Sequence, residues 1–344
     1  ITDAMLLQFE TSFEINGKVV HVSASAGIAI APADGANVEE LIANFDMALY
    51  RAKANSPGGY VFFHNSLRAE AHARRDLDLK LRHAYASGEF ELYFQPQVRL
   101  ADSVLVGAEA LLRWRQGSGA VIAPGAFIET LAASPIAIEV GTWILRTACE
   151  TATTWQSSGL LPRVAVNLFP SQFHDPSFVG TVEKILADTK LPPGALEIEI
   201  TENIALSCNA ATLAPLHKLR AMGIQLAFDD FGTGYGSLSF LTEMPLSHIK
   251  IDQSFIRELS NSNKAAAIIR SLIAMARNIG LQVIAEGVET VSQAQFLRSE
   301  GCDEAQGYFF AKPLPASEFE VLLKMTNLNG DLRHPTDTKI ALKA

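Results

Sequence analysis

The spacing of apolar and polar residues changes along this chain, and after Gly88 it becomes a regular alternation of strand and helix patterns. One helical stretch is 264–279, in which Ile269 and Ile273 belong to one apolar face, and Gly280 stands where helices commonly end. The short apolar runs that predict strands are Phe90–Gln95, Leu105–Leu112, Val164–Leu168, Leu196–Thr201, Gln225–Phe228, His248–Ile251, Gln282–Ala285 and Glu304–Phe309. These eight runs, mostly separated by helices, favour an α/β fold of the (β/α)8 TIM-like barrel type, with a doubly wound sheet as the alternative.

The residues before this region predict a small α+β block over 1–63. Val19–Pro32 alternates and favours a strand, Val38–Ala54 has helical spacing, and Tyr60–Phe63 returns to strand character. This is too little chain for an independent α/β domain, and it begins in mid-pattern at Ile1. We therefore expect the block to be truncated and the chain to be a piece of a longer protein.

Between the two regions, residues 64–87 are rich in charged residues and predict a linker helix. Leu77, Leu81 and Ala84 fall on one face of it. Such a helix either leads as a solvated segment into the next domain or serves in dimerisation or signalling, and the sequence leaves both readings open. The domain boundaries predicted in this way are 1–63, 64–87 and 88–326, followed by a polar tail over 327–344.

Composition narrows the function classes. Hydrophobic residues make up 48% of the 344 residues, which is typical of a folded chain. A net charge of −9 argues against sequence-independent binding of DNA or RNA. The pattern predicts no membrane span and no signal peptide. Three scattered cysteines, Cys149, Cys208 and Cys302, favour a reducing compartment, so we expect a cytoplasmic location, with a membrane-associated parent protein left open.

Polar residues gather where the predicted strands end. They are Glu109, Asn167, Glu199, Glu202, Asp229, Asp230, Lys250, Asp252, Glu286, Glu289 and Gln306. One such residue is more often a helix cap or a solvated loop group. In a parallel barrel, however, the carboxyl ends of all strands open on one face, where barrel enzymes have their active sites. The recurrence at so many strand ends therefore predicts a site.

So many acidic groups around one opening would repel each other unless cations neutralise them. Ligation by oxygen atoms without Cys or His favours Mg²⁺ or Mn²⁺. The adjacent pair Asp229–Asp230 favours two ions, an arrangement suited to in-line attack of activated water on a phosphodiester. Lys250, between Ile249 and Ile251, is expected to point inward to carboxylate partners, either as a structural ion pair or as part of the site. Arg113 is either a ligand of an anionic substrate or a surface residue.

The sequence lacks the motifs of several other classes of enzyme. The stretch 232–237, GTGYGS, departs from the dinucleotide-binding fingerprint at its sixth position. The chain has no P-loop, no H-E-x-x-H motif and no G-x-S-x-G elbow. These negatives favour metal-assisted chemistry.

Read together, the strand-end motifs resemble the EAL family of cyclic di-GMP phosphodiesterases. The resemblance covers about Leu81 to Leu314. Its motifs are YFQPQ at 93–97, EALLRW at 109–114, AVNL at 165–168, EIEITE at 197–202, DDFGTGY at 229–235, KID at 250–252, AEGVE at 285–289 and QGY at 306–308. Their order along the chain makes the signal specific.

The resemblance implies a barrel that uses Mg²⁺ or Mn²⁺, two per site, to cleave one phosphodiester of cyclic di-GMP and give linear pGpG. The implied metal ligands are Glu109, Asn167, Glu199, Asp229, Asp230 and Glu289. The implied substrate contacts are Gln95, Leu112 and Arg113. A homodimer through the barrel is also implied.

Four further residues have implied catalytic roles. Lys250 would orient or help to activate the attacking water, Glu286 would support the metals, and Gln306 would help to place the nucleophile. Glu202 would anchor the loop 230–241. Gly236 departs from the family pattern there, where a serine is usual, and is expected to soften this loop.

The first block resembles the C-terminal end of a GGDEF, or diguanylate cyclase-like, domain through SAGIA at 25–29 and DMALYRAK at 46–53. The signature loop of that family is absent from the sequence, so we expect no cyclase activity from this chain. Two rival functions remain for the barrel: a non-catalytic cyclic di-GMP receptor and an unrelated metal-dependent barrel enzyme.

Overall fold

The computed structural model describes residues 2–9, 12–15, 18–20, 22–55, 58–160, 163–202, 204, 213–232, 241, 243–259 and 262–329. It divides into two compact units, residues 1–82 and 83–344, which are described separately. The expectations about Cys208, about Gly236 and most of its loop, and about the tail beyond 329 fall outside the described residues. No helix in the described part of the chain is both long and apolar enough to span a membrane.

The N-terminal unit is built around one helix and two short strands. α2 (Val38–Asn55) packs against β3 (Ala26–Ile28) and β4 (Tyr60–Phe62), which pair in parallel. Gly27 has no side chain because a Cβ there would lie 2.2 Å from the backbone oxygen of Phe45 on α2. The unit also contains α1 (Thr2–Leu6), the 3-10 turn η1 (Leu7–Phe9), and the hairpin of β1 (Phe13–Ile15) and β2 (Lys18–Val20).

The predicted long strand Val19–Pro32 is therefore wrong in extent. Val19 and Val20 are the last residues of β2 and Ala26–Ile28 is β3, whereas residues 22–25 belong to neither strand. A strand needs a hydrogen-bonded neighbour, and β4, opposite β3, is three residues long. The helix expected over 64–87 is present as α3 (Asn65–Ala86), and the division between the two units falls inside it.

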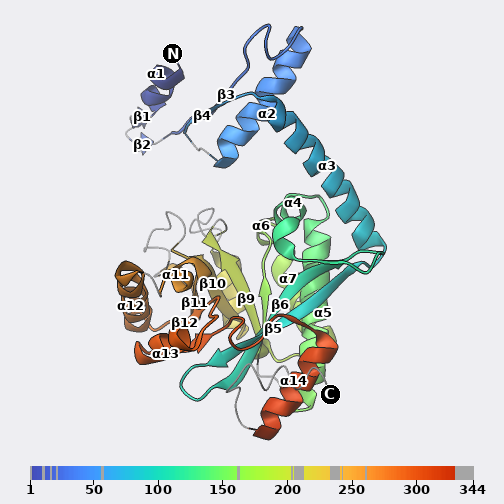
Figure 1. Cartoon of the computed structure of the whole chain (residues 1–344), viewed down its shortest axis with the longest axis vertical. Coiled ribbons are helices and arrows are strands. Elements are labelled where there is room, and N and C mark those ends of the chain that lie inside the picture. The colour runs from blue at the N-terminus through green and yellow to red at the C-terminus, as the bar shows by residue number, and fades with distance from the viewer. Residues whose placement is uncertain are drawn as a thin grey trace. The chain divides into compact units, whose positions relative to one another are not determined.

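The second unit is a closed barrel (Figure 1). Its eight strands, in order around the ring, are β5 (Phe90–Arg99), β13 (Glu304–Ala305), β12 (Gln282–Ala285), β11 (His248–Ile251), β10 (Gln225–Phe231), β9 (Leu196–Thr201), β8 (Val164–Asn167) and β6 (Val104–Arg115). The ring closes because β5 pairs with β13 on one side and with β6 on the other. The α/β barrel prediction is confirmed, and the doubly wound alternative is wrong because the sheet has closed on itself.

One strand corrects the expectation of an all-parallel barrel. β5 runs antiparallel to both of its neighbours in the ring, β6 and β13. The reason lies in the connection: only residues 100–103 join β5 to β6, and a parallel crossover needs a dozen residues or more. The last strand is also shorter than the predicted run Glu304–Phe309.

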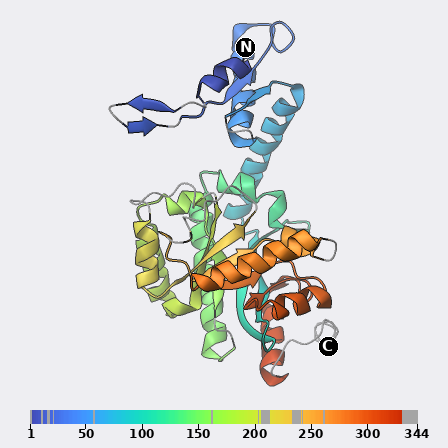
Figure 2. The same cartoon turned by 90° about the vertical axis from the view of Figure 1, so that its left-hand side faces the viewer.

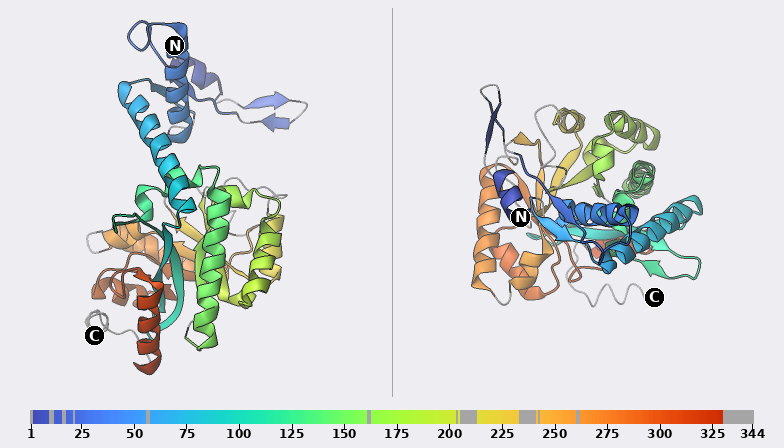
Figure 3. Two further views of the ribbon diagram at one scale, coloured as in Figure 1. Left: turned by 90° about the vertical axis from the view of Figure 1, so that its right-hand side faces the viewer. Right: turned by 90° about the horizontal axis from the view of Figure 1, so that it is seen from above.

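Helices surround the strands, as the view from above shows (Figure 3). They are α4 (Ile128–Ala132), α5 (Ala137–Ser157), α6 (Pro170–Phe173), α7 (Phe178–Thr189), α9 (Ala214–Ala221), α11 (Gln253–Glu258), α12 (Asn263–Asn278), α13 (Val291–Ser299) and α14 (Ala316–Asn329). Short elements complete the unit: β7 (Val121–Ile122), β14 (Leu314–Pro315), η2 (Pro124–Ala126) and η3 (Pro193–Ala195). α12, orange in Figure 2, is capped by Ser262, whose hydroxyl accepts a hydrogen bond from the Ala265 amide. This helix buries Ile269 and Ile273, as its spacing predicted.

The interior of this barrel is polar. On β9, Leu196, Ile198 and Ile200 are buried on one face. Because side chains alternate along a strand, Glu197 and Glu199 belong to the other face, where they contact cationic side chains of neighbouring strands. Both glutamates are fully buried. The barrel core therefore consists of an outer apolar layer beneath the helices and an inner set of paired polar groups.

Candidate active site

Lys250 lies at the centre of the polar interior, in contact with carboxylates from four other strands or strand ends. Its Nζ is 2.6 Å from Glu286 Oε1, 2.9 Å from Glu199 Oε2, 3.0 Å from Asp229 Oδ1 and 3.7 Å from Glu109 Oε2. The side chain is fully buried. The parallel strands β6, β9, β10, β11 and the end of β12 thus bring together residues separated by up to 177 positions in the sequence (286 − 109).

Two amide side chains tie this cluster together. Asn167 donates from Nδ2 to Glu109 Oε1 at 2.8 Å, and Gln306 donates from Nε2 to Glu109 Oε2 at 2.6 Å. Gln306 also donates to Glu286 Oε1 at 3.2 Å. Both oxygens of Glu109 are therefore held from either side, which fixes the orientation of its carboxylate.

Three carboxylates approach one another where β10 and β12 end. One oxygen from each of Asp229, Asp230 and Glu286 falls within 4.8 Å of the other two. Asp230 has a φ of +56°, a left-handed conformation that only glycine adopts without cost and that Asp and Asn tolerate better than most residues. With this backbone turn, the adjacent carboxylates of Asp229 and Asp230 both come near Glu286.

The electrostatics show more negative charge than the described residues neutralise. Burial raises the pKa of Glu286 to about 8, although Lys250 opposes the rise. Burial and the charge of Glu109 hold the pKa of Glu199 well above its usual value. Burial, with Asp229 and Asp252 nearby, raises the pKa of Asp230 to about 6. These carboxyl groups therefore need either protons or cations in order to stay close together.

The pKa values of Glu109 and Lys250 shift in the direction that favours their charged forms. Burial alone would raise the pKa of Glu109, but Lys250 and the bonds from Gln306 and Asn167 outweigh it, so this pKa is lowered. Burial would lower the pKa of Lys250, yet Asp229, Glu109 and the other carboxylates hold it well above its usual value. Lys250 is thus a fixed positive charge within an acidic cluster.

The cluster opens into a cavity of about 510 Å³, a size typical of small-molecule sites. Its lining includes Glu109, Asp229, Glu286, Glu289 and Gln306. Among the residues predicted to contact substrate, Gln95 and Arg113 also line the cavity, and Gln95 donates to the Ala311 carbonyl at 3.2 Å. Burial lowers the pKa of Arg113, whose guanidinium lies 5.2 Å from the centre of the Tyr93 ring.

The alternation of β6 decides which leucine faces the cavity. Leu111 lines it, together with Glu109 and Arg113, two residues away on either side. Leu112, the residue predicted to contact substrate, alternates to the other face and is buried there. Among the described residues, the structure therefore offers Leu111 rather than Leu112 to a bound molecule.

Glu202 and Glu289 stand apart from the contacts around Lys250. Glu202 follows β9, and its Oε1 is buried without a hydrogen-bond donor among the described residues. Most of the loop that it was predicted to anchor lies outside the described residues, so that role stays a prediction. Glu289 lines the cavity, and its backbone N–H donates to Gln293 Oε1 at 2.8 Å.

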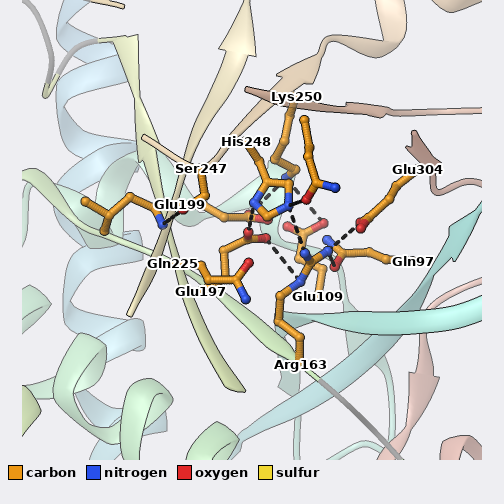
Figure 4. A network of polar contacts seen from close by, with 12 residues as sticks. Gln97, Glu109, Arg163, Glu197, Glu199, Gln225, Ser247, His248, Lys250 and Glu304 are labelled. Carbon is orange, nitrogen blue, oxygen red and sulfur yellow. Dashed lines mark hydrogen bonds and ion pairs between the residues drawn. The ribbon is translucent and has the colours of Figure 1, made fainter. Parts of the chain in front are cut away.

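Sequence reasoning missed a second polar layer inside the barrel, shown in Figure 4. Arg163 donates to Glu304 Oε2 at 2.5 Å and to Gln97 Oε1 at 2.9 Å, and its Nε lies 3.6 Å from Glu197 Oε1. His248 Nδ1 lies 2.5 Å from Glu197 Oε2. The available signal was the two-residue spacing that puts Gln97 on the same face as Gln95, and Glu197 on the same face as Glu199. The lining residues Gln253, Arg257 and Tyr308 were missed as well.

Comparisons with known proteins show the family to which this barrel belongs. Residues 78–313, more than half of the chain, match the EAL domain family. The chain belongs to the EAL domain family. Residues 1–57 match the family described as diguanylate cyclase, GGDEF domain, so the prediction of an EAL barrel preceded by a GGDEF fragment is confirmed.

Relatives of this EAL chain include two proteins of Pseudomonas aeruginosa. One is the bifunctional diguanylate cyclase/cyclic di-GMP phosphodiesterase MucR, 36% identical over 92% of this chain and 47% of its own length. The other is the cyclic di-GMP phosphodiesterase NbdA, 34% identical over 94% of this chain and 42% of its own length. The chain thus spans less than half the length of these relatives.

Among solved structures, the EAL barrel is similar to that of the PaMucR phosphodiesterase in complex with c-di-GMP. The two are 36% identical with a TM-score of 0.68, and the match covers 71% of this chain and 99% of the other.

Proposed function

We propose that this chain is a metal-dependent phosphodiesterase that hydrolyses one phosphodiester bond of cyclic di-GMP to give linear pGpG. The observation that carries the proposal is the set of carboxylates held around Lys250, of which Glu109, Asp229 and Glu286 line a cavity of about 510 Å³. Membership of the EAL family and the similarity to proteins named as cyclic di-GMP phosphodiesterases support it.

The donor set fits hard divalent cations. Glu199 Oε1 is buried without a hydrogen-bond donor among the described residues, and one oxygen each of Asp229, Asp230 and Glu286 lies within 4.8 Å of the others. Because Asn167 uses its Nδ2 to bond Glu109, its amide oxygen is left for another partner. All of these donors are oxygen atoms, which Mg²⁺ and Mn²⁺ prefer.

We assign the metal sites to Glu109, Asn167, Glu199, Asp229 and Asp230, with support from Glu286 and Glu289. Two ions of Mg²⁺ or Mn²⁺ would supply the positive charge that activates water and stabilises a phosphoryl group during displacement. The protein's own residues do the rest: Lys250 donates hydrogen bonds toward the reacting phosphate or water, and Gln306 fixes the carboxylates of Glu109 and Glu286.

The cavity also provides groups suited to a dianionic dinucleotide. Arg113 and Arg257 line it and carry positive charge, whereas the catalytic wall is acidic. Gln95 and Tyr308 add an amide and an aromatic ring, which suit the edge and face of a nucleobase. We propose that these residues bind the parts of the ligand that do not react.

The first test is incubation of the purified chain with cyclic di-GMP and Mg²⁺ or Mn²⁺, followed by separation of the products. We expect pGpG with either metal and none in EDTA. The variant Glu109→Gln removes one charge from the centre of the site and is expected to lower turnover by at least 10²-fold. Glu300→Gln is the matched control, because Glu300 pairs with Arg270 on the surface and is expected to leave turnover unchanged.

Three outcomes of this test would decide against the proposal. Full activity in EDTA would exclude the role of the metal, and full activity of Glu109→Gln would exclude the assigned site. Saturable binding of cyclic di-GMP without any product would instead identify the barrel as a receptor for this ligand.

A further inference from the structure

Two buried amide groups connect the second polar layer to the catalytic cluster. Arg163 donates from Nη2 to Gln97 Oε1 at 2.9 Å, and Gln97 donates from Nε2 to Gln306 Oε1 at 3.2 Å. Gln306 then donates from Nε2 to Glu109 and Glu286. The three residues of this relay, Arg163, Gln97 and Gln306, are at most 6% exposed, and Gln97 is fully buried.

We propose that Gln97 and Arg163 are positioning residues, which set the orientation of the Gln306 amide and through it the carboxylates of Glu109 and Glu286. The inference rests on the proposed function, because its readout is the hydrolysis that this cluster performs. Neither positioning residue is among those that line the cavity, so their effect passes through Gln306.

The direction of the relay follows from the chemistry of its two ends. A guanidinium group only donates hydrogen bonds, so the end of the Gln97 amide that faces Arg163 must be its oxygen. The NH₂ group of Gln97 is then left for Gln306, which must present its own oxygen in return. The NH₂ group of Gln306 consequently points to Glu286 and to Glu109. The lowered pKa of Glu109 keeps its carboxylate ionised, and an ionised carboxylate only accepts hydrogen bonds. A donor at one end and acceptors at the other thus fix both amides in one orientation.

The space around the relay is filled in a way that holds Gln97 in place. Gly107 lies opposite Gln97 in the pairing of β5 with β6. A Cβ at Gly107 would lie 2.7 Å from Gln97 Oε1 and 3.1 Å from Arg163 Nε, so the missing side chain makes room for their contact. The backbone of β6 therefore packs directly against the pair.

Arg163 is itself held by charge on several sides. Glu304 accepts from its Nη2, Glu197 lies 3.6 Å from its Nε, and His248 Nε2 lies 3.1 Å from its Nη1. Burial would lower the pKa of Arg163, but Glu197 and Glu304 outweigh this and raise it. The donor end of the relay is thus a permanent cation in a fixed place.

If the relay orients Gln306, the isosteric substitution Gln97→Glu should lower hydrolysis more than the apolar substitution Gln97→Met. In Gln97→Glu, the new carboxylate still accepts from Arg163 but has no N–H for Gln306. The oxygen of Gln306 would then face another oxygen, which favours rotation of its amide and turns a carbonyl toward Glu109 and Glu286. In Gln97→Met, Gln306 loses one partner without meeting a repulsive group.

The test compares kcat, KM and thermal stability of the full chain with the variants Gln97→Met, Gln97→Glu and Gln282→Met. We expect Gln97→Met to lower kcat about 10-fold and Gln97→Glu about 10²-fold, the range found when the supporting partners of metal-site residues are removed, with KM within about threefold of the unaltered chain. Gln282→Met is the control, since the exposed Gln282 contacts His248 in the same layer at 3.0 Å but is not part of the relay. Its kcat is expected to stay unchanged.

If Gln97 served only to stabilise the fold, the two Gln97 variants would rank in the opposite order of kcat. Gln97→Glu keeps the shape of the side chain and the contact with Arg163, so it would then retain more activity than Gln97→Met, and that ranking would overturn the inference. A kcat equal to that of the unaltered chain in both Gln97 variants would also overturn it. Absence of hydrolysis in the unaltered chain would instead show that the proposed function has failed.

Discussion

Lys250 is a buried cation whose value to the fold depends on the carboxylates around it. Taking an ammonium group out of water is costly, and the cost is offset only when opposite charges are close. Here Glu286, Glu199 and Asp229 lie within 3.0 Å of its Nζ, with Glu109 slightly farther away. Lys250 therefore offsets part of the negative charge of the carboxylates around it, and they in turn offset the cost of its burial.

Replacement of this cation is predicted to destabilise the chain in a way that metal ions reverse. Lys250→Met leaves several buried carboxylates without their counter-charge, so in EDTA we expect the free energy of unfolding to fall by about 3 kcal/mol. Added Mn²⁺ is expected to restore more stability to this variant than to the unaltered chain, because the ions take over the role of the positive charge. Denaturant titrations with and without Mn²⁺ measure both quantities.

Lys324→Met serves as the control for this prediction, since Lys324 pairs with Glu320 on the surface and is expected to change the free energy of unfolding by less than about 0.5 kcal/mol. Equal stability of Lys250→Met and the unaltered chain in EDTA would show that the ion pairs with Lys250 do not stabilise the fold.

Among individual residues, the sequence predicted that the polar side chains now seen around Lys250 would come together. The contacts of Glu109, Asn167, Asp229 and Gln306 arise because parallel strands end on one face, a rule that sequence alone can apply. The layer around Arg163 was not predictable in this way. A single Arg, His or Glu within a strand most often points to solvent. Only the closure of the ring shows that these side chains point into the barrel.

At the scale of elements, the apolar runs predicted where most strands lie but not their direction. Side chains alternate in the same way in parallel and antiparallel strands, so the pattern does not reveal that β5 runs opposite to its neighbours. The predicted run Phe90–Gln95 is also too short. β5 continues to Arg99, and Pro96 lies within it, opposite Ala108 of β6. The length of the turn at 100–103 was the better guide.

The C-terminal end of helix α7 allows the energetic cost of a left-handed backbone conformation to be tested. It stops at Lys190, which has φ +62° and ψ +21°, a conformation that disfavours any side chain with a Cβ. Lys190→Gly removes this strain, and after the greater flexibility of glycine in the unfolded chain is subtracted, we expect a gain of about 0.5 kcal/mol in the free energy of unfolding.

A lysine-to-glycine substitution six residues earlier, at Lys184, is expected to lower the free energy of unfolding instead. Lys184 lies exposed in the middle of α7, where glycine costs about 1 kcal/mol relative to a good helix former. Denaturation of the two variants side by side measures both effects. A loss of stability in Lys190→Gly would mean that the end of α7 is held by something other than its backbone geometry.

At the scale of the whole molecule, the closed ring explains how the second unit holds together. Every strand of the ring has neighbours on both sides, so the ring presents no free edge for pairing with other chains. The homodimer that the family resemblance implies stays a prediction, to be measured by light scattering. The N-terminal unit has a much smaller core, a cluster of Ala48, Phe63 and Leu67.

Removal of the N-terminal unit up to α3 is predicted to leave the barrel folded. A chain that begins at Asn65 keeps α3 and all eight strands, so we expect cooperative unfolding and hydrolysis at the rate of the whole chain. A chain that begins at Pro96 loses the first part of β5 and leaves β6 without its partner, so we expect no cooperative transition. Calorimetry of the two shortened chains tests both expectations, and a folded product from the second would contradict the importance of ring closure.

The reversed direction of β5 also determines where the chain enters the barrel. Phe90 pairs with Trp114 at the carboxyl end of β6, next to Arg113, which lines the cavity. In an all-parallel barrel the first strand would begin at the opposite end. A domain grafted directly before Phe90 would therefore be tethered at the end of the ring where Arg113 lines the cavity, so a short lever arm would suffice to alter access to that cavity.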